Sequence, residues 1–146
     1  MAETSASEAQ RRAERAAAAL YARDAATRSL GILVSGVHPG GCQARMTVRA
    51  DMVNGHGACH GGFVFALADS AFAFACNSYN ETTVAAAAQI DFLLAARAGD
   101  ELTAEAHEQW RTRRNGIYEV VVFNQRRERV ALFRGRSHRI DGQVTE

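Results

Sequence analysis

The sequence predicts an α+β fold in which an antiparallel sheet wraps around one long, buried helix. The segment HGGFVFALADSAFAFACNSY, residues 60–79, carries apolar side chains on all sides of a helix, which is typical of a buried helix. Strand-like segments bounded by turn residues lie on both sides of it in the chain. A single long apolar helix together with hairpin-connected strands favours a sheet that packs around the helix.

Residues 1–28 predict a helical segment outside the main domain, which we assign to residues 29–146. The segment is rich in alanine, the strongest intrinsic helix former, and it carries many charges. Ser5-Ala-Ser-Glu8 has the form of a capping box, so we expect the helix to follow it and to run to about Thr27. Its expected role is that of a surface or packing helix.

Six strands are expected in the main domain. Residues 31–50 predict two short strands around a turn at Pro39-Gly40, and four more strands follow the buried helix in residues 82–140. Turns between these four are expected at residues 98–100 and at Asn115-Gly116, a strong hairpin dipeptide. In the last strand, period-two alternation separates two faces. One of these faces carries Leu132, Arg134, Arg136 and His138.

Composition argues against several classes of function. The chain has 17 basic and 16 acidic residues, a balance that gives no reason to expect a nucleic-acid partner. Its three cysteines include no CxxC pair, which fits a reducing compartment. The N-terminus lacks the apolar run of a signal peptide, and residues 62–76 are too short for a membrane span. We therefore expect a cytoplasmic protein with no membrane partner.

Asp69 stands alone among apolar residues in the middle of the predicted buried helix. An unpaired carboxylate in apolar surroundings is costly, or it stays protonated. One interpretation is structural, in which Asp69 pairs with an arginine or accepts backbone hydrogen bonds at a subunit interface. The other is a general base or nucleophile that is tuned by its surroundings.

Gly61 begins the same helix, where the first amides have no intrahelical acceptor and can bind a carbonyl or an oxyanion. Eight residues separate Gly61 from Asp69, a rise of about 12 Å along an α-helix. One reacting group cannot lie within reach of both residues on a single helix. If both act in one site, Asp69 must come from a second copy, which requires a homodimer with two composite sites.

The motifs now resemble a known family. The segment NGHGACHGGFVFALADSAFAFACNS, with IDFL at residues 90–93, AGD at 98–100 and VALFRGRSHRI at 130–140, closely resembles the hotdog-fold acyl-CoA thioesterases of the phenylacetate-degradation (PaaI) type. The resemblance extends from about residue 20 to residue 140. It implies the hotdog fold, in which a long helix is wrapped by an antiparallel sheet, and it implies dimers that commonly pair into homotetramers.

The resemblance also implies roles for four residues. Asp69 matches the catalytic carboxylate, which acts on the thioester directly or through water, and Gly61 matches the glycine whose amide polarises the thioester carbonyl. Asn54 matches the asparagine that helps to bind the carbonyl or orient the attack, and His60 is expected to support the loop. Some relatives carry a serine or threonine in the strand after the helix. That side chain lies close to the nucleophilic water in those relatives, and the polar residues that could take its place here are Thr82, Thr83 and Gln89.

Coenzyme A is expected as part of the substrate. Its phosphates are groups that arginine holds well, so we assign Arg134, Arg136 and His138, with the backbone at Gly62, to substrate binding. A solvated sheet face is the alternative for the basic residues. We expect no metal and no other cofactor, because a fourth zinc ligand is not evident beside His56, Cys59 and His60. A Cys59 nucleophile is a further alternative.

The expected activity is hydrolysis of acyl-CoA thioesters to a free acid and CoA, with a preference for aromatic acyl groups such as phenylacetyl or hydroxyphenylacetyl. Two alternatives remain open. Hotdog folds also host hydratases and dehydratases of acyl thioesters, which would use a histidine such as His56 or His60. A non-catalytic acyl-CoA-binding module is the third possibility, although such a module has little reason to bury Asp69.

Overall fold

The structure is a computed structural model that describes residues 2–146, with the side chains of residues 5–146. Its helices are α1 (Ala2–Arg23), α2 (Ala25–Ser29), the 3-10 helix η1 (Ala50–Met52) and α3 (Gly61–Cys76). Its strands are β1 (Leu33–His38), β2 (Gly41–Thr47), β3 (Glu81–Phe92), β4 (Glu101–Arg111), β5 (Asn115–Phe123) and β6 (Arg129–Gln143).

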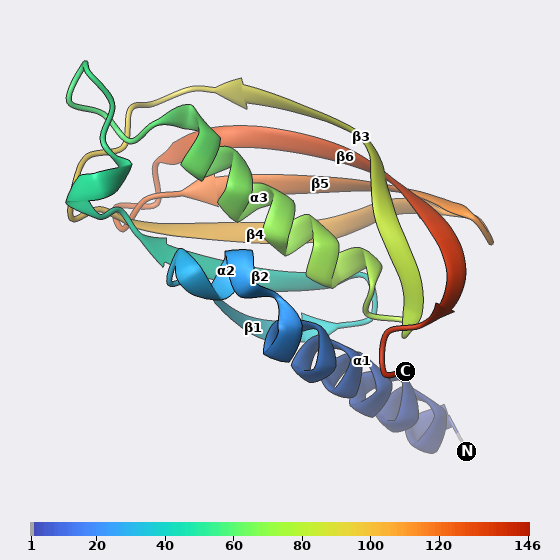
Figure 1. The fold of residues 1–146 in the computed structure, drawn as a ribbon. Helices are drawn as coiled ribbons and strands as arrows, with labels where there is room; N and C mark the ends of the chain where they lie inside the picture. The colour runs from blue at the N-terminus through green and yellow to red at the C-terminus, as the bar shows by residue number, and fades with distance from the viewer. Residues whose placement is uncertain (1) are drawn as a thin grey trace.

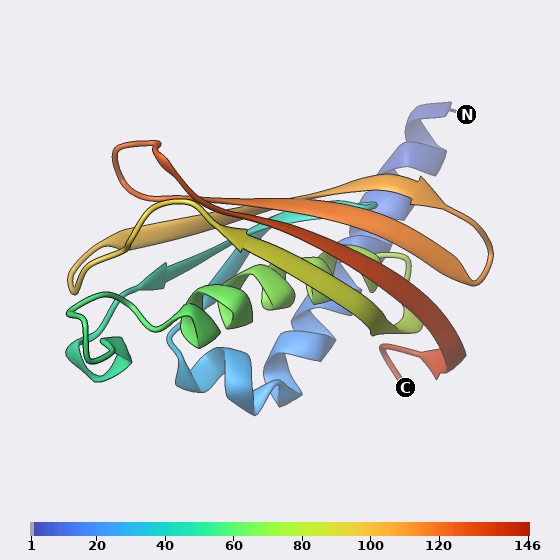
Figure 2. The same cartoon turned by 90° about the horizontal axis from the view of Figure 1, so that it is seen from above.

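The strands form one antiparallel sheet in the order β1-β2-β4-β5-β6-β3. The sheet curves around α3, which lies along its concave face (Figure 1). Seen from above, the sheet lies on one side of α3 and the short helix α2 on the other (Figure 2). The α+β fold and the wrapped central helix are therefore confirmed, and β1 and β3 are the two edges of the sheet.

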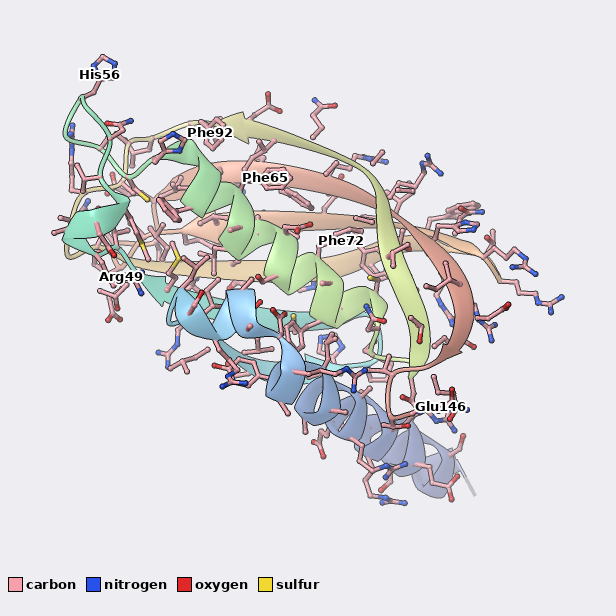
Figure 3. The ribbon with its side chains drawn as sticks, viewed as in Figure 1. Arg49, His56, Phe65, Phe72, Phe92 and Glu146 are labelled. Carbon is pink, nitrogen blue, oxygen red and sulfur yellow. The ribbon has the colours of Figure 1, made fainter. Side chains whose placement is uncertain are left out.

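Aromatic packing holds α3 against the sheet. The Phe72 ring lies 5.7 Å from the Phe133 ring and 5.6 Å from the Tyr118 ring, measured between centroids. Gly135 on β6 makes this approach possible, because a Cβ atom at that position would lie 2.9 Å from three atoms of Phe72. Phe65 and Phe72 mark the side of α3 that faces the sheet (Figure 3). Burial of these large rings is the main force that seats α3 in the sheet.

The N-terminal helix differs from its prediction at both ends. The predicted capping box at Ser5–Glu8 lies inside α1, which begins at Ala2. The helix stops at Arg23, because the carboxylate of Asp24 accepts a hydrogen bond from the Thr27 N–H at 3.0 Å and caps a separate short helix, α2. A local side-chain cap thus replaces a continuous helix.

The N-terminal segment packs along β1, the edge strand of the sheet. The side-chain amide of Gln10 donates to the carbonyl of Val37 at 2.7 Å, and the Tyr21 hydroxyl donates to the carbonyl of Ile32 at 2.8 Å. One of these carbonyls belongs to β1, and the other belongs to the residue just before it. Helix α1 therefore covers an edge that would otherwise be open to another strand.

The hairpin between β4 and β5 turns two residues before the predicted position. Asn115 is already the first residue of β5, and the turn is formed by Arg113 and Arg114. Thr112 closes it, since its N–H donates to the Asn115 carbonyl at 2.7 Å and its hydroxyl accepts the Asn115 N–H at 3.1 Å. Gly116 lies in the strand, where a Cβ would approach Tyr118 to 2.8 Å. Close packing, and not a turn, accounts for this glycine.

Among the described residues, no helix has the length and apolar character needed to cross a membrane.

Candidate active site

The N-terminal end of α3 offers one free backbone donor. His60 is the N-cap, and its Nδ1 accepts the N–H of Gly62 at 3.0 Å, while the Phe63 N–H donates to the His60 carbonyl at 2.9 Å. The N–H of Gly61 has no acceptor among the described residues. Because the helix dipole also makes this end positive, the Gly61 amide can polarise a carbonyl oxygen.

His60 and Gly62 thus serve the helix end itself. The accepting Nδ1 of His60 fixes the first turn of α3, and its expected support of the loop stays a prediction. The predicted substrate contact through Gly62 has to use some other backbone atom, since its N–H already donates to His60.

Asn54 shapes the loop that leads into α3. Its Oδ1 accepts the N–H groups of His56 at 2.9 Å and Ala58 at 3.2 Å, and its own N–H donates to the Ala58 carbonyl at 2.7 Å. The Nδ2 group has no partner within the described chain, so the side chain keeps a donor for a ligand. His56 lies at the exposed tip of the same loop (Figure 3).

An apolar hollow of about 370 Å³ lies beside Gly61. Phe92 borders it, and its ring lies so close to Gly61 that a Cβ there would be 3.0 Å from Phe92 Cζ. Phe92 is 56% exposed and Leu93 is 52% exposed, although both are large apolar residues. Figure 3 places Phe92 over the first turn of α3. The remaining lining comes from Cys59, Val64, Leu94, Ala95, Ala96 and Val130.

The carboxylate of Asp69 is half-buried and has no hydrogen bond or ion pair within the described chain. The structural interpretation, in which an arginine or backbone amides satisfy it, therefore has no support inside one copy. Burial raises the pKa of Asp69, and the negative charge of Asp24 raises it further. An ionised carboxylate of this kind is a stronger base than an ordinary aspartate.

One copy of the chain does not bring Gly61 and Asp69 together. Both lie on α3, which is straight enough to keep the residues about 12 Å apart along its axis (Figure 1). Asn54 and Gly61 cluster at the N-terminal end of the helix, whereas Asp69 lies in its middle.

The basic residues assigned to CoA lie on the opposite face of the sheet from α3. Along β6, Phe133, Gly135 and Ser137 are buried against the helix side, so the alternating residues Arg134 and Arg136 point to solvent. Arg134 pairs with Glu119 at 3.0 Å. His138 Nδ1 lies 3.3 Å from Asn115 Oδ1 on the neighbouring strand. Within one chain these residues do not join Gly61, and their assignment to CoA stays a prediction.

Two residues near the candidate site have no role in the sequence-based prediction. Phe92 belongs to the IDFL motif, but its contact with Gly61 depends on how β3 ends over the start of α3. Arg97 donates to the carbonyl of Gly57 at 3.1 Å, so it places a positive charge beside the Asn54 loop. The cation lies next to a glycine-rich loop in space but 40 residues away in sequence, which no local pattern indicates.

The other candidate chemistries at this end find little geometric support. Among the described residues no group of three or more His, Cys, Asp and Glu side chains is arranged to hold a metal ion. Burial raises the pKa of the Cys59 thiol, which disfavours the thiolate that a cysteine nucleophile needs.

Comparison with known proteins confirms the resemblance. The thioesterase superfamily profile matches residues 56–131, more than half of the chain. The acyl-coenzyme A thioesterase PaaI of Escherichia coli (strain K12) is 48% identical over 127 residues, which cover 87% of this chain and 91% of that protein. A solved structure of E. coli PaaI, from the phenylacetic acid degradation operon, superposes with a TM-score of 0.90 at 46% identity and covers 92% of this chain and 97% of its own. A solved variant of phenylacetic acid degradation protein PaaI from Thermus thermophilus gives a TM-score of 0.75 at 38% identity, covering 78% and 97% of the two chains. The chain belongs to the thioesterase superfamily and, within it, to the hotdog-fold proteins of the PaaI type.

Proposed function

We propose that this protein hydrolyses acyl-CoA thioesters to a carboxylic acid and free CoA. The observation that carries the proposal is the pair of unsatisfied groups on α3, the unbonded N–H of Gly61 and the unpaired carboxylate of Asp69. A thioesterase needs such a pair, because one group must polarise the carbonyl and the other must deliver the attack. The E. coli relative that is named an acyl-coenzyme A thioesterase supports the same activity.

In this mechanism the thioester carbonyl oxygen accepts the Gly61 N–H, assisted by the Asn54 side-chain amide. Asp69 of a second copy takes a proton from water while the water oxygen bonds to the carbonyl carbon. The carbon–sulfur bond then breaks, and the CoA thiolate leaves and receives the proton. Direct attack by the Asp69 carboxylate, followed by hydrolysis of the mixed anhydride, balances equally well. Neither route requires a metal or another cofactor.

The composite site requires a homodimer, and the edge strand β3 supports one. β3 pairs only with β6 among the described strands, and residues 84–89 are exposed along it. A long, flat, unpaired edge is a template for pairing with another strand. Antiparallel pairing of two β3 strands would extend the sheet across both copies and set two α3 helices side by side. Further pairing into a homotetramer is proposed from the family alone.

The hollow beside Gly61 supports an aromatic acyl group. Phe92 and its apolar neighbours offer a wall on which a flat ring can stack, and such aromatic contacts are worth about 0.5–1.5 kcal/mol beyond area burial. We therefore propose phenylacetyl-CoA and its ring-hydroxylated derivatives as preferred substrates. Arg97, beside the Asn54 loop, is a cation of the same chain that a CoA phosphate could meet near the proposed carbonyl site.

A hydratase has less support. Such chemistry would use a histidine base, but Nδ1 of His60 accepts the Gly62 N–H and His56 lies at the exposed tip of its loop.

The test is free-thiol release from a panel of acyl-CoAs that includes phenylacetyl-CoA, hydroxyphenylacetyl-CoA and linear acyl-CoAs. Wild type and Asp69→Asn are measured side by side, because the amide has the same shape but cannot act as a base. We expect release by wild type, fastest with aromatic acyl groups, and a loss of at least about 100-fold in the variant. Release from none of the thioesters would overturn the proposal.

A further inference from the structure

A hydrogen-bonded chain links the N-terminal segment to the middle of α3. The Thr27 hydroxyl donates to Asp24 Oδ2 at 2.7 Å, and the same Thr27 oxygen lies 3.1 Å from the hydroxyl of Ser70. A hydroxyl has one proton, and that of Thr27 is given to Asp24, so the Ser70 hydroxyl is the donor in the second bond. The chain therefore runs from Ser70 through Thr27 to the carboxylate of Asp24.

This chain reaches α3 beside Asp69, the residue that precedes Ser70. Thr27 is 3% exposed, so water does not compete for its hydroxyl. Hydrogen bonds in such a buried environment are stronger and keep the two partners of Thr27 at fixed positions. Asp24 is also fixed from a second direction, because its Oδ1 accepts the Thr27 N–H at 3.0 Å. Both oxygens of Asp24 are thus committed to Thr27, and its position relative to α3 is set.

We propose, on the basis of the proposed function, that Asp24 is a positioning residue for Asp69: through Thr27 and Ser70 it fixes the turn of α3 that carries the catalytic carboxylate. The N-terminal segment then serves the reaction as well as covering the edge of the sheet. In a composite site, the N-terminal segment of one copy would position Asp69 as the base. The other copy would supply the backbone N–H that binds the carbonyl oxygen of the substrate.

The charges around Asp69 agree with this role. Burial is the largest cause of the raised pKa of Asp69, and the negative charge of Asp24 opposes its ionisation further. Cys76 lies on the same helix, but burial raises its pKa to about 12, so it is neutral at ordinary pH. The Asp24 charge therefore adds to the effect of burial on the pKa of Asp69, and the ionised carboxylate is a stronger base.

Asp24→Asn is the first test variant, since asparagine caps helices as well as aspartate does and removes the charge. Its Nδ2 group donates to the Thr27 hydroxyl where Oδ2 of Asp24 accepts, so the Thr27 proton turns toward Ser70 and the contact is kept with its direction reversed. The side-chain carboxyl carbon of Asp69 is followed by 13C NMR as the pH is raised, with the signal assigned from Asp69→Asn. We expect Asp69 to titrate at a lower pH in Asp24→Asn than in wild type. The acidic limb of kcat/KM for an acyl-CoA substrate should shift to lower pH by the same amount.

Thr27→Val and Asp51→Asn complete the design. Thr27→Val keeps the Asp24 charge but breaks the chain to Ser70, so we expect kcat to fall several-fold while the acidic limb stays in place. Asp51 is exposed and pairs with Arg49 at 3.0 Å, so its neutralisation should change neither kcat nor the acidic limb of kcat/KM.

The inference is overturned if Asp69 titrates at the same pH in Asp24→Asn as in wild type, or if Asp51→Asn shifts the titration of Asp69 by the same amount. Because the NMR titration needs no turnover, it separates this inference from a failure of thioester hydrolysis.

Discussion

Asp69 is a carboxylate with no hydrogen-bond or ion-pair partner in the described part of the chain, on a largely apolar helix, and burial raises its pKa above the ordinary value of 3.8. The folded protein therefore binds the proton more tightly than the unfolded chain does. Stability must then fall as pH rises from the ordinary to the raised pKa of Asp69, and the full cost applies above that window. A residue that lowers the stability of the folded protein in this way is expected where activity requires it.

Asp69→Asn should for this reason be more stable than wild type at neutral pH, while it loses activity. The amide carries no charge to desolvate, so its melting temperature should exceed that of wild type above the raised pKa. Below the ordinary aspartate pKa both forms are neutral, and the difference should vanish. Calorimetry across a pH series measures this, and a variant that is less stable at neutral pH would mean that Asp69 has a stabilising partner.

Phe92→Ala should change substrate preference with little effect on stability, because the side chain is 56% exposed. Removal of the ring takes away an aromatic contact worth about 0.5–1.5 kcal/mol. We therefore expect kcat/KM for phenylacetyl-CoA to fall about threefold to tenfold relative to a linear acyl-CoA. Leu33→Ala is the matched control, since Leu33 is 57% exposed but lies on the opposite edge strand. An equal fall for both acyl classes would contradict a specific role for Phe92.

The sequence indicates Gly61 and Asp69 as site residues, because each is anomalous in its own local pattern: a glycine at a helix start and a charge in an apolar run. Phe92 is different, since a phenylalanine at a strand end is unremarkable until the strand is placed over α3. The prediction that Arg134 and Arg136 share a face is confirmed. Alternation along a strand does not indicate which face of the sheet meets the site. In the structure, Arg134 and Arg136 lie on the face of the sheet that points away from α3.

At the scale of elements, the contact between α3 and β6 depends on the absence of a side chain. Gly135 sits under the Phe72 ring, and the sequence does not mark these two residues as a pair. The strands themselves could be predicted from alternation and turn residues. The β4–β5 turn could not be placed correctly, because Thr112 closes it through its own side chain before Asn115-Gly116 is reached.

Gly135→Ala should destabilise the protein by about 1–3 kcal/mol, the usual cost of overpacking a core. Chemical denaturation measures the change as a lower midpoint. Gly55→Ala is the control, since a Cβ at Gly55 meets no atom within 4 Å. Replacing the Phe72 ring by a smaller side chain, with Phe72→Leu in the Gly135→Ala background, should recover part of the lost stability. If the single variant matches wild type, the ring has room to move and the close contact is unimportant.

At the scale of the molecule, the two edges of the sheet are treated differently. The N-terminal segment hydrogen-bonds to carbonyls along and just before β1, whereas β3 is left with an open edge and exposed alanines. Small side chains allow close approach of another strand. The asymmetry indicates that one edge is closed to association and the other is available for it.

The double variant Ala85→Arg/Ala87→Arg should be monomeric and inactive. Antiparallel self-pairing of β3 would bring the new arginines of two copies together, and like charges across paired strands are destabilising. Sedimentation velocity reports the mass, and free-thiol release reports activity on the same samples. A monomer that still hydrolyses acyl-CoA would show that the site is complete in one chain, contrary to the distance of about 12 Å between Gly61 and Asp69 along α3.

The cap at the start of α3 also bears on the end of the catalytic cycle. The His60 side chain accepts the Gly62 N–H, which leaves the Gly61 N–H as the free amide at this end of α3. A helix without such a cap would have several free amides there. A neutral carbonyl needs only one such donor. The acid that forms has two charged oxygens for that single amide and meets the like charge of Asp69. The helix end at which we propose that the thioester binds should therefore hold the released acid weakly, and we expect only weak product inhibition.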